Sequence, residues 1–445
     1  MEKGIRLADM QNEYKRLLLI SRGPWRNDRN SGSTYTTLFK NWPSNKISHL
    51  YMRPDLPSNQ VCDNYFHITD KQIIESVFRR KPAGNRVSKQ SGMIKTTIAE
   101  EQENKDGITK LYQFFKYRLS TVGEICREFF WWIGRVDYKK LDRWVEEHSP
   151  EIVHLSCTSS LYVYRMANHI IQKYNLPFVM YASDDVYAYH GFNFSPLFWA
   201  HRLMVRHRMR ENIRAAKAVF VISLPQKEIY ENLFGRQMHI ITKNITGCKI
   251  KSHLQQSDII NFVYMGNIGS GRWKVLEKIA KEIEKINQNT QKCQLKIYSN
   301  LSLPSKIRKK LTLPGTSEIL PAVAGEQVQY ILSENDVLLH VESFKSSDKS
   351  MTRLSFSAKL VEYFEAGKCI LAVGPMENAS IQYLQKNDAA IVITDLTSKK
   401  LFEVFERILS NSEEIDSYAR KAHDCGKRNH AQGSSEKVYL TYINK

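Results

Sequence analysis

The sequence predicts an α/β protein built from two doubly wound, Rossmann-like domains that face a central cleft. Short apolar runs alternate with longer amphipathic stretches, which is typical of parallel strand–helix units. The alternation stops in the polar segment Thr246–Asp258 and then restarts. A chain of 445 residues, 42% of them hydrophobic, is long enough for two cores. Because ligands bind at the carboxyl ends of parallel strands, we expect the binding site in the cleft.

The first half contains the apolar runs and helical stretches of one such domain. The expected strands are Arg16–Ser21, Ile47–Met52, Glu151–Ser156, Phe178–Tyr181 and Ala218–Ser223. The expected helices are Leu111–Glu147, Leu161–Tyr174 and Phe198–Ala216. Between them, Arg22–Ser33 is a predicted loop. The polar, charged residues 79–110 show little periodicity, so we predict a loop or a mobile insertion there.

The second half repeats the pattern without repeating the sequence. Its expected strands are Ile259–Met265, Leu295–Tyr298, Val337–Val341, Cys369–Val373 and Ala390–Ile393. Its expected helices are Trp273–Asn287, Gln327–Glu334, Ser357–Ala366, Ile381–Gln385, Lys400–Leu409 and Ser412–His423. We therefore predict an N-terminal domain over residues 1–250 and a C-terminal domain over residues 251–425. The remaining segment, 426–445, is expected to pack back on the N-terminal domain.

Composition narrows the partners and the compartment. The formal charge of +19 favours anionic partners, namely nucleic acid, nucleotide phosphates or an acidic membrane surface. The seven cysteines include no CxxC pair, and HExxH is absent, which indicates a reduced, intracellular protein without structural zinc. The first 20 residues do not resemble a signal peptide, and no apolar run reaches the ~18 residues of a spanning helix. We expect a cytoplasmic protein, either soluble or attached to the inner face of a membrane.

The segment Ser355–Lys368 carries the main chemical prediction. Leu360, Val361 and Phe364 form an apolar stripe at helical spacing, Ser355 or Ser357 can cap the helix start, and Gly367 suits its left-handed end. The N-terminus of such a helix presents free N–H groups that suit a diphosphate. Lys359 in the first turn opposes the helix dipole, which makes sense if an anion binds there. Glu365 can accept hydrogen bonds from a vicinal diol such as ribose.

This segment resembles the donor-binding motif of GT-B glycosyltransferases, in particular the retaining, family-four type enzymes of bacterial lipopolysaccharide, capsule, exopolysaccharide and O-antigen synthesis. In that branch two glutamates are separated by seven residues, and the second, followed by a small residue and Gly, binds the ribose. Glu365-Ala366-Gly367 matches the second glutamate. Ser357 stands where the family has the first, which lies near the donor sugar.

Other segments extend the resemblance in the same order along the chain. Phe262–Arg272 looks like the first strand and phosphate loop of the C-terminal domain, which implies phosphate contacts for Gly266, Asn267 and Arg272. Asn335–Glu342 looks like the strand before the donor loop. At the other end, a loop resembles the one that faces acceptor and phosphates; its candidate residues are Gly23, Ser31, Gly32 and Ser33.

Two acidic residues and a basic helix are the candidates on the acceptor side. Asp184 and Asp185 follow a predicted strand. We expect one of them to act as a base or to bind the acceptor; the alternative is that the pair only caps a helix or lines a turn. His154 lies inside an apolar run and is predicted to be a core residue. A stripe that recurs every four residues suits an anionic membrane or a lipid-diphosphate acceptor, with a solvated helix face as the alternative. It consists of Arg202, Arg206, Arg210 and Arg214. The aromatic run 129–133 is predicted to be a buried helix rather than a membrane anchor.

The sequence thus predicts transfer of a sugar from a UDP- or GDP-sugar to a glycan or lipid-linked acceptor, without a cofactor or a bound metal. A GT-B relative that does not transfer sugar, such as a nucleotide-sugar epimerase, is one alternative. A basic nucleic-acid-binding protein is another, but no helix-turn-helix, zinc finger or ribonucleoprotein motif supports it. The resemblance favours retention of configuration.

Overall fold

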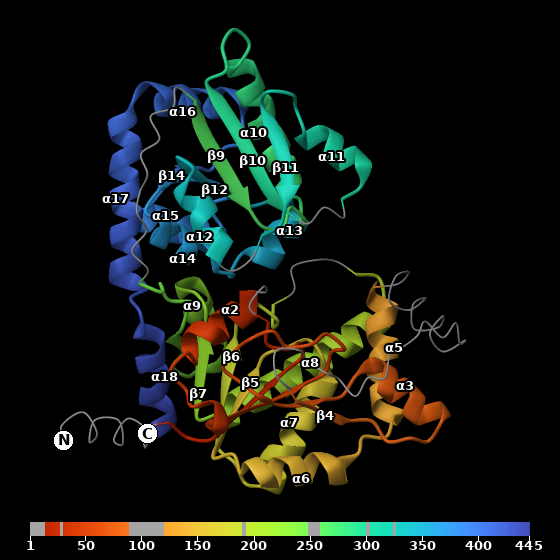
Figure 1. Ribbon diagram of the computed structural model, residues 1–445. Coiled ribbons are helices and arrows are strands. Elements are labelled where there is room, and N and C mark those ends of the chain that lie inside the picture. The colour runs from red at the N-terminus through yellow and green to blue at the C-terminus, as the bar shows by residue number, and fades with distance from the viewer. Residues whose placement is uncertain are drawn as a thin grey trace, which may run out of the picture.

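The computed structural model describes residues 14–26, 30–88, 120–188, 193–247, 259–299, 303–323 and 326–445. It confirms two Rossmann-like domains, one above the other in Figure 1. The N-terminal sheet has the strand order β4-β3-β2-β1-β5-β6-β7-β8, and the C-terminal sheet has the order β11-β10-β9-β12-β13-β14. Apart from the antiparallel pair β3–β4, the strand pairs in both sheets are parallel.

The elements of the N-terminal domain follow the predicted alternation. Its strands are β1 (Leu17–Ser21), β2 (Ile47–Tyr51), β3 (Asn64–His67), β4 (Asn85–Ser88), β5 (Ile152–Ser156), β6 (Phe178–Ala182), β7 (Ala218–Val221) and β8 (His239–Ile240). Its helices are α2 (Asn30–Leu38), η1 (Ser44–Lys46), α3 (Asp70–Phe78), α5 (Ser120–Ile133), α6 (Tyr138–His148), α7 (Leu161–Lys173), α8 (Pro196–Ala215) and α9 (Leu224–Phe234).

The C-terminal domain repeats the architecture with a different strand order. Its strands are β9 (Ile260–Met265), β10 (Cys293–Ser299), β11 (Ser317–Pro321), β12 (Val337–Val341), β13 (Cys369–Val373) and β14 (Ile391–Ile393). Its helices are α10 (Arg272–Ile286), α11 (Ser305–Leu311), α12 (Glu326–Ser333), α13 (Ser346–Thr352), α14 (Lys359–Ala366), α15 (Ala379–Lys386), α16 (Ser398–Ser410) and α17 (Ser412–Asn429). Helix α18 (Ser434–Asn444) follows.

Three local predictions are wrong. Strand β4 lies inside the segment 79–110 that we expected to be a loop; residues 89–110 are outside the described part of the chain. The expected loop 22–33 already contains the start of α2. The single helix predicted over 111–147 is broken into α5 and α6. Gly134 follows the end of α5, and only glycine fits there, because a Cβ atom would lie 2.7 Å from Cγ2 of Ile73 on α3.

Both sheets are buried on both faces, as parallel sheets require. Along β1, Leu18 and Ile20 enter one apolar cluster while Leu17 and Leu19 enter the cluster on the opposite face. The C-terminal sheet divides its strand residues between two clusters in the same way. This alternation fixes the register of the strands, because a shift by one residue would turn every apolar side chain to the opposite face.

The end of the chain returns to the N-terminal domain. In Figure 1, α17 runs along the upper domain and α18 lies against the lower one. Tyr439 packs in the N-terminal core, and its hydroxyl lies 2.8 Å from Nδ1 of His154. His154 is fully buried, so its prediction as a core histidine is confirmed. The hydroxyl of Tyr14, just before β1, donates a hydrogen bond of 2.9 Å to Glu436 in the first turn of α18.

Candidate functional site

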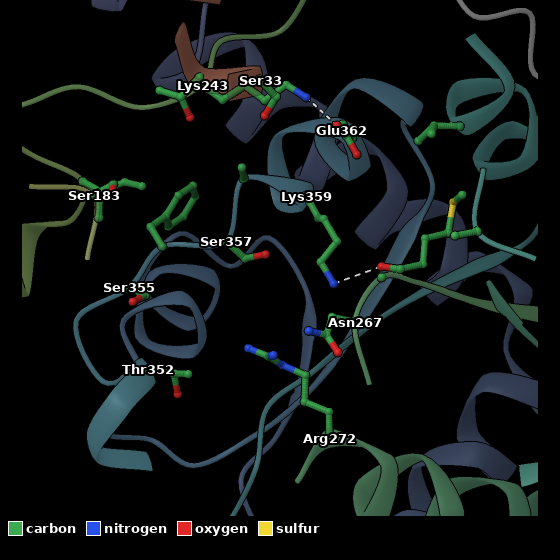
Figure 2. A pocket seen from close by; sticks show the side chains of 18 of the residues that line it. Ser33, Ser183, Lys243, Asn267, Arg272, Thr352, Ser355, Ser357, Lys359 and Glu362 are labelled. Carbon is green, nitrogen blue, oxygen red and sulfur yellow. Dashed lines mark hydrogen bonds and ion pairs between the residues drawn. The ribbon is translucent and has the colours of Figure 1, made fainter. Parts of the chain in front are cut away.

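A cavity of about 1010 Å³ lies between the two domains. The N-terminal domain contributes Ser33 and Thr34 from α2 and Ser183 and Asp184 from the loop after β6. The C-terminal domain contributes a larger set, of which Figure 2 shows a close view. Its polar members include Asn267, Arg272, Glu342, Ser355, Ser357, Lys359, Glu362 and Glu365. The cleft predicted from the alternation pattern is therefore a real cavity with polar groups from both sides.

Lys359 begins α14 and turns into this cavity. Its Nζ donates a hydrogen bond of 2.9 Å to the carbonyl of Met265 and lies 4.8 Å from the ring centre of Tyr264. Burial, together with the positive charge of Arg272, lowers the pKa of Lys359 to about 8. The N-cap residue of the helix, Ala358, makes no side-chain cap hydrogen bond. A cation thus lies beside an uncapped helix N-terminus, and an anion bound here would compensate both.

The loop after β9 holds this lysine in place. Gly266 adopts φ +136°, and a Cβ atom on it would lie only 2.4 Å from Nζ of Lys359. A side chain at this position would displace the ammonium group from the cavity. Asn267 stabilises the following turn, since its Oδ1 accepts a hydrogen bond of 2.7 Å from the amide of Gly269. Figure 2 shows Asn267 between Lys359 and Arg272.

Arg272 is the first residue of α10, and it is paired with a carboxylate that sequence reasoning did not single out. Its Nη2 donates to both oxygens of Glu342, at 3.1 and 2.9 Å. Glu342 follows β12 and is only 4% exposed. Burial raises the pKa of this carboxyl although Arg272 and Lys359 oppose the effect. The signal in the sequence is a single acidic residue directly after an apolar strand.

Two glutamates of α14 meet the segment that links the domains. Glu365 accepts hydrogen bonds on Oε1 from the amide and hydroxyl of Thr246, at 2.8 and 2.5 Å. Glu362, one turn earlier, forms an ion pair with Lys243. Both glutamates line the cavity, but the Glu362 side chain is the more accessible, at 26% exposure. The predicted diol-binding residue Glu365 therefore has a second candidate beside it.

The two aspartates after β6 have different surroundings. Asp184 lines the cavity, and the hydroxyl of Ser355 from the other domain lies 3.3 Å from its Oδ1. Burial in the cleft raises the pKa of Asp184. Asp185 turns into its own domain, where Oδ1 accepts hydrogen bonds from the amide of Ala188 and the hydroxyl of Tyr230. The structure thus presents Asp184 to a ligand and uses Asp185 to fix the loop.

The remaining predicted residues are placed as follows. Ser357 lines the cavity, and its amide donates to the hydroxyl of Ser380 at 3.0 Å. Ser33 lines the cavity from α2, whereas the side chain of Ser31 lies outside the described part. Gly32 lies in α2 beside Ser33, and the Gly23 carbonyl accepts a hydrogen bond from Ser21 at the end of β1.

The predicted arginine stripe of α8 is exposed in its second half, at Arg210 and Arg214, and half-buried in its first. Arg202 and Arg206 are half-buried and donate to the carbonyl of Tyr187, at 2.5 and 2.9 Å. Arg210 donates to the hydroxyl of the same tyrosine at 2.6 Å. Arg214, which is exposed like Arg210, makes none of these contacts to Tyr187. These arginines hold the loop that carries Asp184, because Tyr187 lies three residues further along it.

Two doubly wound domains with such a cavity between them define the GT-B architecture, and solved structures confirm this fold. Sucrose-phosphate synthase of Thermosynechococcus elongatus superposes with a TM-score of 0.57 at 11% identity, covering 97% of this chain and 98% of that chain. Anabaena HepE in complex with UDP-glucose gives 0.61 at 10% identity, covering 97% and 99%. TarM gives 0.58 at 10% identity, with the same coverage. No protein-family model and no curated protein sequence matches the chain.

Proposed function

We propose that this protein transfers a sugar from a nucleoside-diphosphate sugar to a glycan or lipid-linked acceptor in bacterial surface polysaccharide synthesis. The observation that carries the proposal is the convergence of Lys359 and Arg272 at the start of α14, inside the interdomain cavity. A diphosphate is the ligand class that suits two cations and a helix N-terminus. The likeness of the fold to Anabaena HepE, solved in complex with UDP and with UDP-glucose, supports a UDP-sugar as the donor, with a GDP-sugar as the alternative.

The same residues can assist the reaction. As the glycosidic bond to the donor breaks, negative charge develops on the departing diphosphate, and Lys359 and Arg272 would stabilise it. Asp184, on the opposite wall, would accept the proton of the attacking acceptor hydroxyl. Closure of the two domains would exclude water and limit hydrolysis of the donor. The hydrogen bond between Asp184 and Ser355 already joins the two walls.

The proposal is tested by thermal denaturation of the full-length protein with UDP, GDP and their sugars. One diphosphate series should raise the melting temperature, because a ligand at 100 times its dissociation constant adds about 2.7 kcal/mol to the stability of the folded state. Duplex and single-stranded nucleic acid serve as controls for the charge of the protein. Stabilisation by nucleic acid but by none of the nucleotides would contradict the proposal.

Nucleotide affinity should fall as the pH rises above 8. The pKa of Lys359 is lowered to about 8, so its ammonium group loses its proton between about pH 7 and 9. The terminal phosphate of a nucleotide has a second pKa of about 6, so its charge does not change over this pH range. At pH 9 roughly a tenth of the protein keeps this charge, and we expect about tenfold weaker UDP binding than at pH 7. Calorimetric titrations between these values measure the effect. A flat profile would show that the Lys359 charge does not contribute.

The carboxylate that recognises the ribose can be identified by comparing UDP with 2′-deoxy-UDP. We propose Glu362 for this contact, because its side chain is partly exposed and, within the described residues, only one of its oxygens is paired, with Lys243. Glu365, in contrast, is buried and accepts two hydrogen bonds from Thr246. Glu362→Gln should remove the preference for UDP, which is about tenfold for a lost charge-assisted hydrogen bond. Glu365→Gln should keep the preference and lower the melting temperature. The opposite pattern would restore Glu365 as the ribose ligand.

We further propose that the protein attaches to the inner face of the membrane through apolar side chains of α5 and α8. Leu197, Leu203 and Met204 are exposed on α8, and Trp132 is 73% exposed on α5. His201 on α8 lies 3.7 Å from Glu128 on α5. Leu197, Met204 and Trp132 lie three or four residues from a member of that pair and therefore share one surface, whereas Leu203, two residues from His201, lies on another face of α8. The prediction that 129–133 is buried holds for Trp131 and is wrong for Phe129, Trp132 and Ile133. Within the described residues no helix is long and apolar enough to span a bilayer.

Attachment is measured by flotation with vesicles that contain anionic lipid. Replacing Trp132 and Leu197 by serine should release the protein, because burying each such side chain contributes about 1.5–3 kcal/mol. Phe402→Ser is the matched control, since Phe402 is an exposed aromatic residue on α16 of the other domain. Equal flotation of all variants would contradict attachment through this surface.

A further inference from the structure

Three arginines gather at the carboxyl edge of the N-terminal sheet, outside the cavity described above. Arg22 follows β1 and Arg53 lies two residues beyond β2, while Arg127 comes from α5. None of them lines the donor cavity. The strand order reverses between β1 and its neighbour β5, and in doubly wound sheets ligands bind at such a switch point.

Arg22 and Arg53 are adjacent because their strands are paired in parallel. Ser21 lies opposite Tyr51, and the amide of Met52 donates to the carbonyl of Arg22 at 3.1 Å. Both side chains are half-buried. Within the described part of the chain, neither guanidinium forms a hydrogen bond or ion pair with a protein group, and the Nε atom of Arg22 is buried without a partner. A buried guanidinium donor without an acceptor is costly unless a ligand provides one.

Asp70, an acid whose charge acts on Arg53, is already engaged. Asp70, at the start of α3, accepts a hydrogen bond of 3.0 Å from Nε of Arg127 on one oxygen and one of 2.7 Å from the Trp131 indole on the other. Burial lowers the pKa of Arg53, and the charges of Arg22 and Arg127 add to this effect. Asp70 therefore compensates Arg127, and the cluster keeps an excess of positive charge.

An aromatic pair closes one side of the cluster. Tyr162, the second residue of α7, stacks on Trp131 with ring centres 4.2 Å apart and planes 9° apart. The charges of Arg22 and Arg127 both act on the buried Tyr162 hydroxyl. Helix α7 also starts here, directly after β5, and its N-cap Ser160 makes no side-chain cap hydrogen bond. The site therefore has a stacked aromatic pair at one side, two guanidinium groups available to a ligand and a third held by Asp70.

We propose that Arg22 and Arg53 bind an oxyanion, a phosphate or carboxylate group, carried by the acceptor substrate. Guanidinium groups bind both kinds of anion through paired hydrogen bonds, which gives the site its selectivity for planar or tetrahedral oxyanions. The identity of the ligand as the acceptor rests on the proposed glycosyl transfer, whereas anion binding by the cluster does not. The protein would then hold two anions on facing edges, the donor diphosphate at α14 and the acceptor group at β1 and β2.

The test is calorimetric titration of full-length protein saturated with UDP, using glucose 6-phosphate and glucuronate as probes and glucose as the uncharged control. We expect one binding event for at least one anionic probe. Arg22→Gln or Arg53→Gln should weaken it at least tenfold, whereas Arg208→Gln, an exposed arginine paired with Glu211 on α8, should not. Unchanged UDP binding shows that each variant is folded. Arg53→Lys should bind the probe more tightly than Arg53→Gln but more weakly than the wild type, because lysine keeps the positive charge and lacks the two parallel N–H donors of a guanidinium group.

The outcomes separate this proposal from the donor site. Binding of glucose 6-phosphate indicates a phosphate-bearing acceptor, and binding of glucuronate indicates a carboxylate-bearing one. No binding of either anion, or binding that the arginine variants do not change, would overturn the proposal. If UDP itself does not bind, the same titrations without UDP, on the Lys359→Met variant, still test the arginine cluster, so failure of the donor site is recognised separately.

Discussion

Replacement of Asp184 by asparagine is expected to lower kcat by roughly 10²–10⁴-fold, which is the usual contribution of a positioned general base. Asp184 lines the cavity, faces the donor side through Ser355 and has a pKa raised by burial, so its carboxylate has an increased affinity for a proton. Asparagine keeps the shape and the hydrogen bond to Ser355 but cannot accept the proton. UDP affinity should therefore remain unchanged, and the loss should appear in the rate of UDP release in the presence of acceptor.

Asp185 is the matched control for this substitution. Its carboxylate accepts hydrogen bonds from Ala188 and Tyr230 inside the N-terminal domain, so Asp185→Asn should lower the free energy of unfolding by about 1 kcal/mol. Its kcat should fall far less than that of Asp184→Asn. If Asp184→Asn kept the wild-type kcat, or if the two variants lost activity equally, Asp184 would not be the base.

Replacement of Lys359 by methionine should abolish most of the nucleotide affinity without destabilising the free protein. A charge-assisted hydrogen bond in a buried site contributes about 1.5–3 kcal/mol. Its loss should raise the dissociation constant of the nucleotide roughly 10–150-fold. Methionine fills a similar volume, and it removes a buried ammonium group whose lowered pKa shows the cost of its burial. The melting temperature of the ligand-free variant should therefore equal or exceed that of the wild type.

Calorimetry with UDP and GDP, together with thermal denaturation of the free protein, measures both effects. Lys274→Ala is the control, since Lys274 is exposed on α10 and does not line the cavity. A Lys359→Met variant that binds the nucleotides as the wild type does would show that the diphosphate does not bind at the start of α14. A variant that loses binding only because it unfolds would be recognised from its melting temperature.

Much of the fold could be predicted from the sequence because parallel strands buried on both faces appear as continuous apolar runs. The segment Cys369–Val373 is such a run, and the structure has β13 with the same bounds. Strand β4 could not be predicted, because Asn85–Ser88 is a polar edge strand that pairs antiparallel with β3 and lacks the apolar pattern. Helix α3 was missed because its nine residues, although they include Ile73, Ile74, Val77 and Phe78, are too short a segment to show a helical period.

The candidate site was predictable where one segment carries the chemistry, and not where distant segments meet. Lys359 and Glu365 could be chosen because one helix holds them at a recognisable spacing. Glu342 could not, since its importance depends on Arg272, which lies 70 residues away in the sequence. The arginines of α8 have helical spacing, yet Arg202 and Arg206 are half-buried, because the Tyr187 carbonyl that they bind comes from another segment. Periodicity identifies a shared helix face but not what covers that face.

The most direct measurement is a crystal structure of the full-length protein with UDP or GDP, whichever stabilises it. We predict that the diphosphate lies at the N-terminus of α14, within hydrogen-bonding distance of Nζ of Lys359, and that Arg272 contacts the same group. The ribose should lie beside Glu362. A nucleotide bound elsewhere, or a diphosphate that contacts neither Lys359 nor Arg272, would contradict the assignment of the interdomain cavity as a donor site.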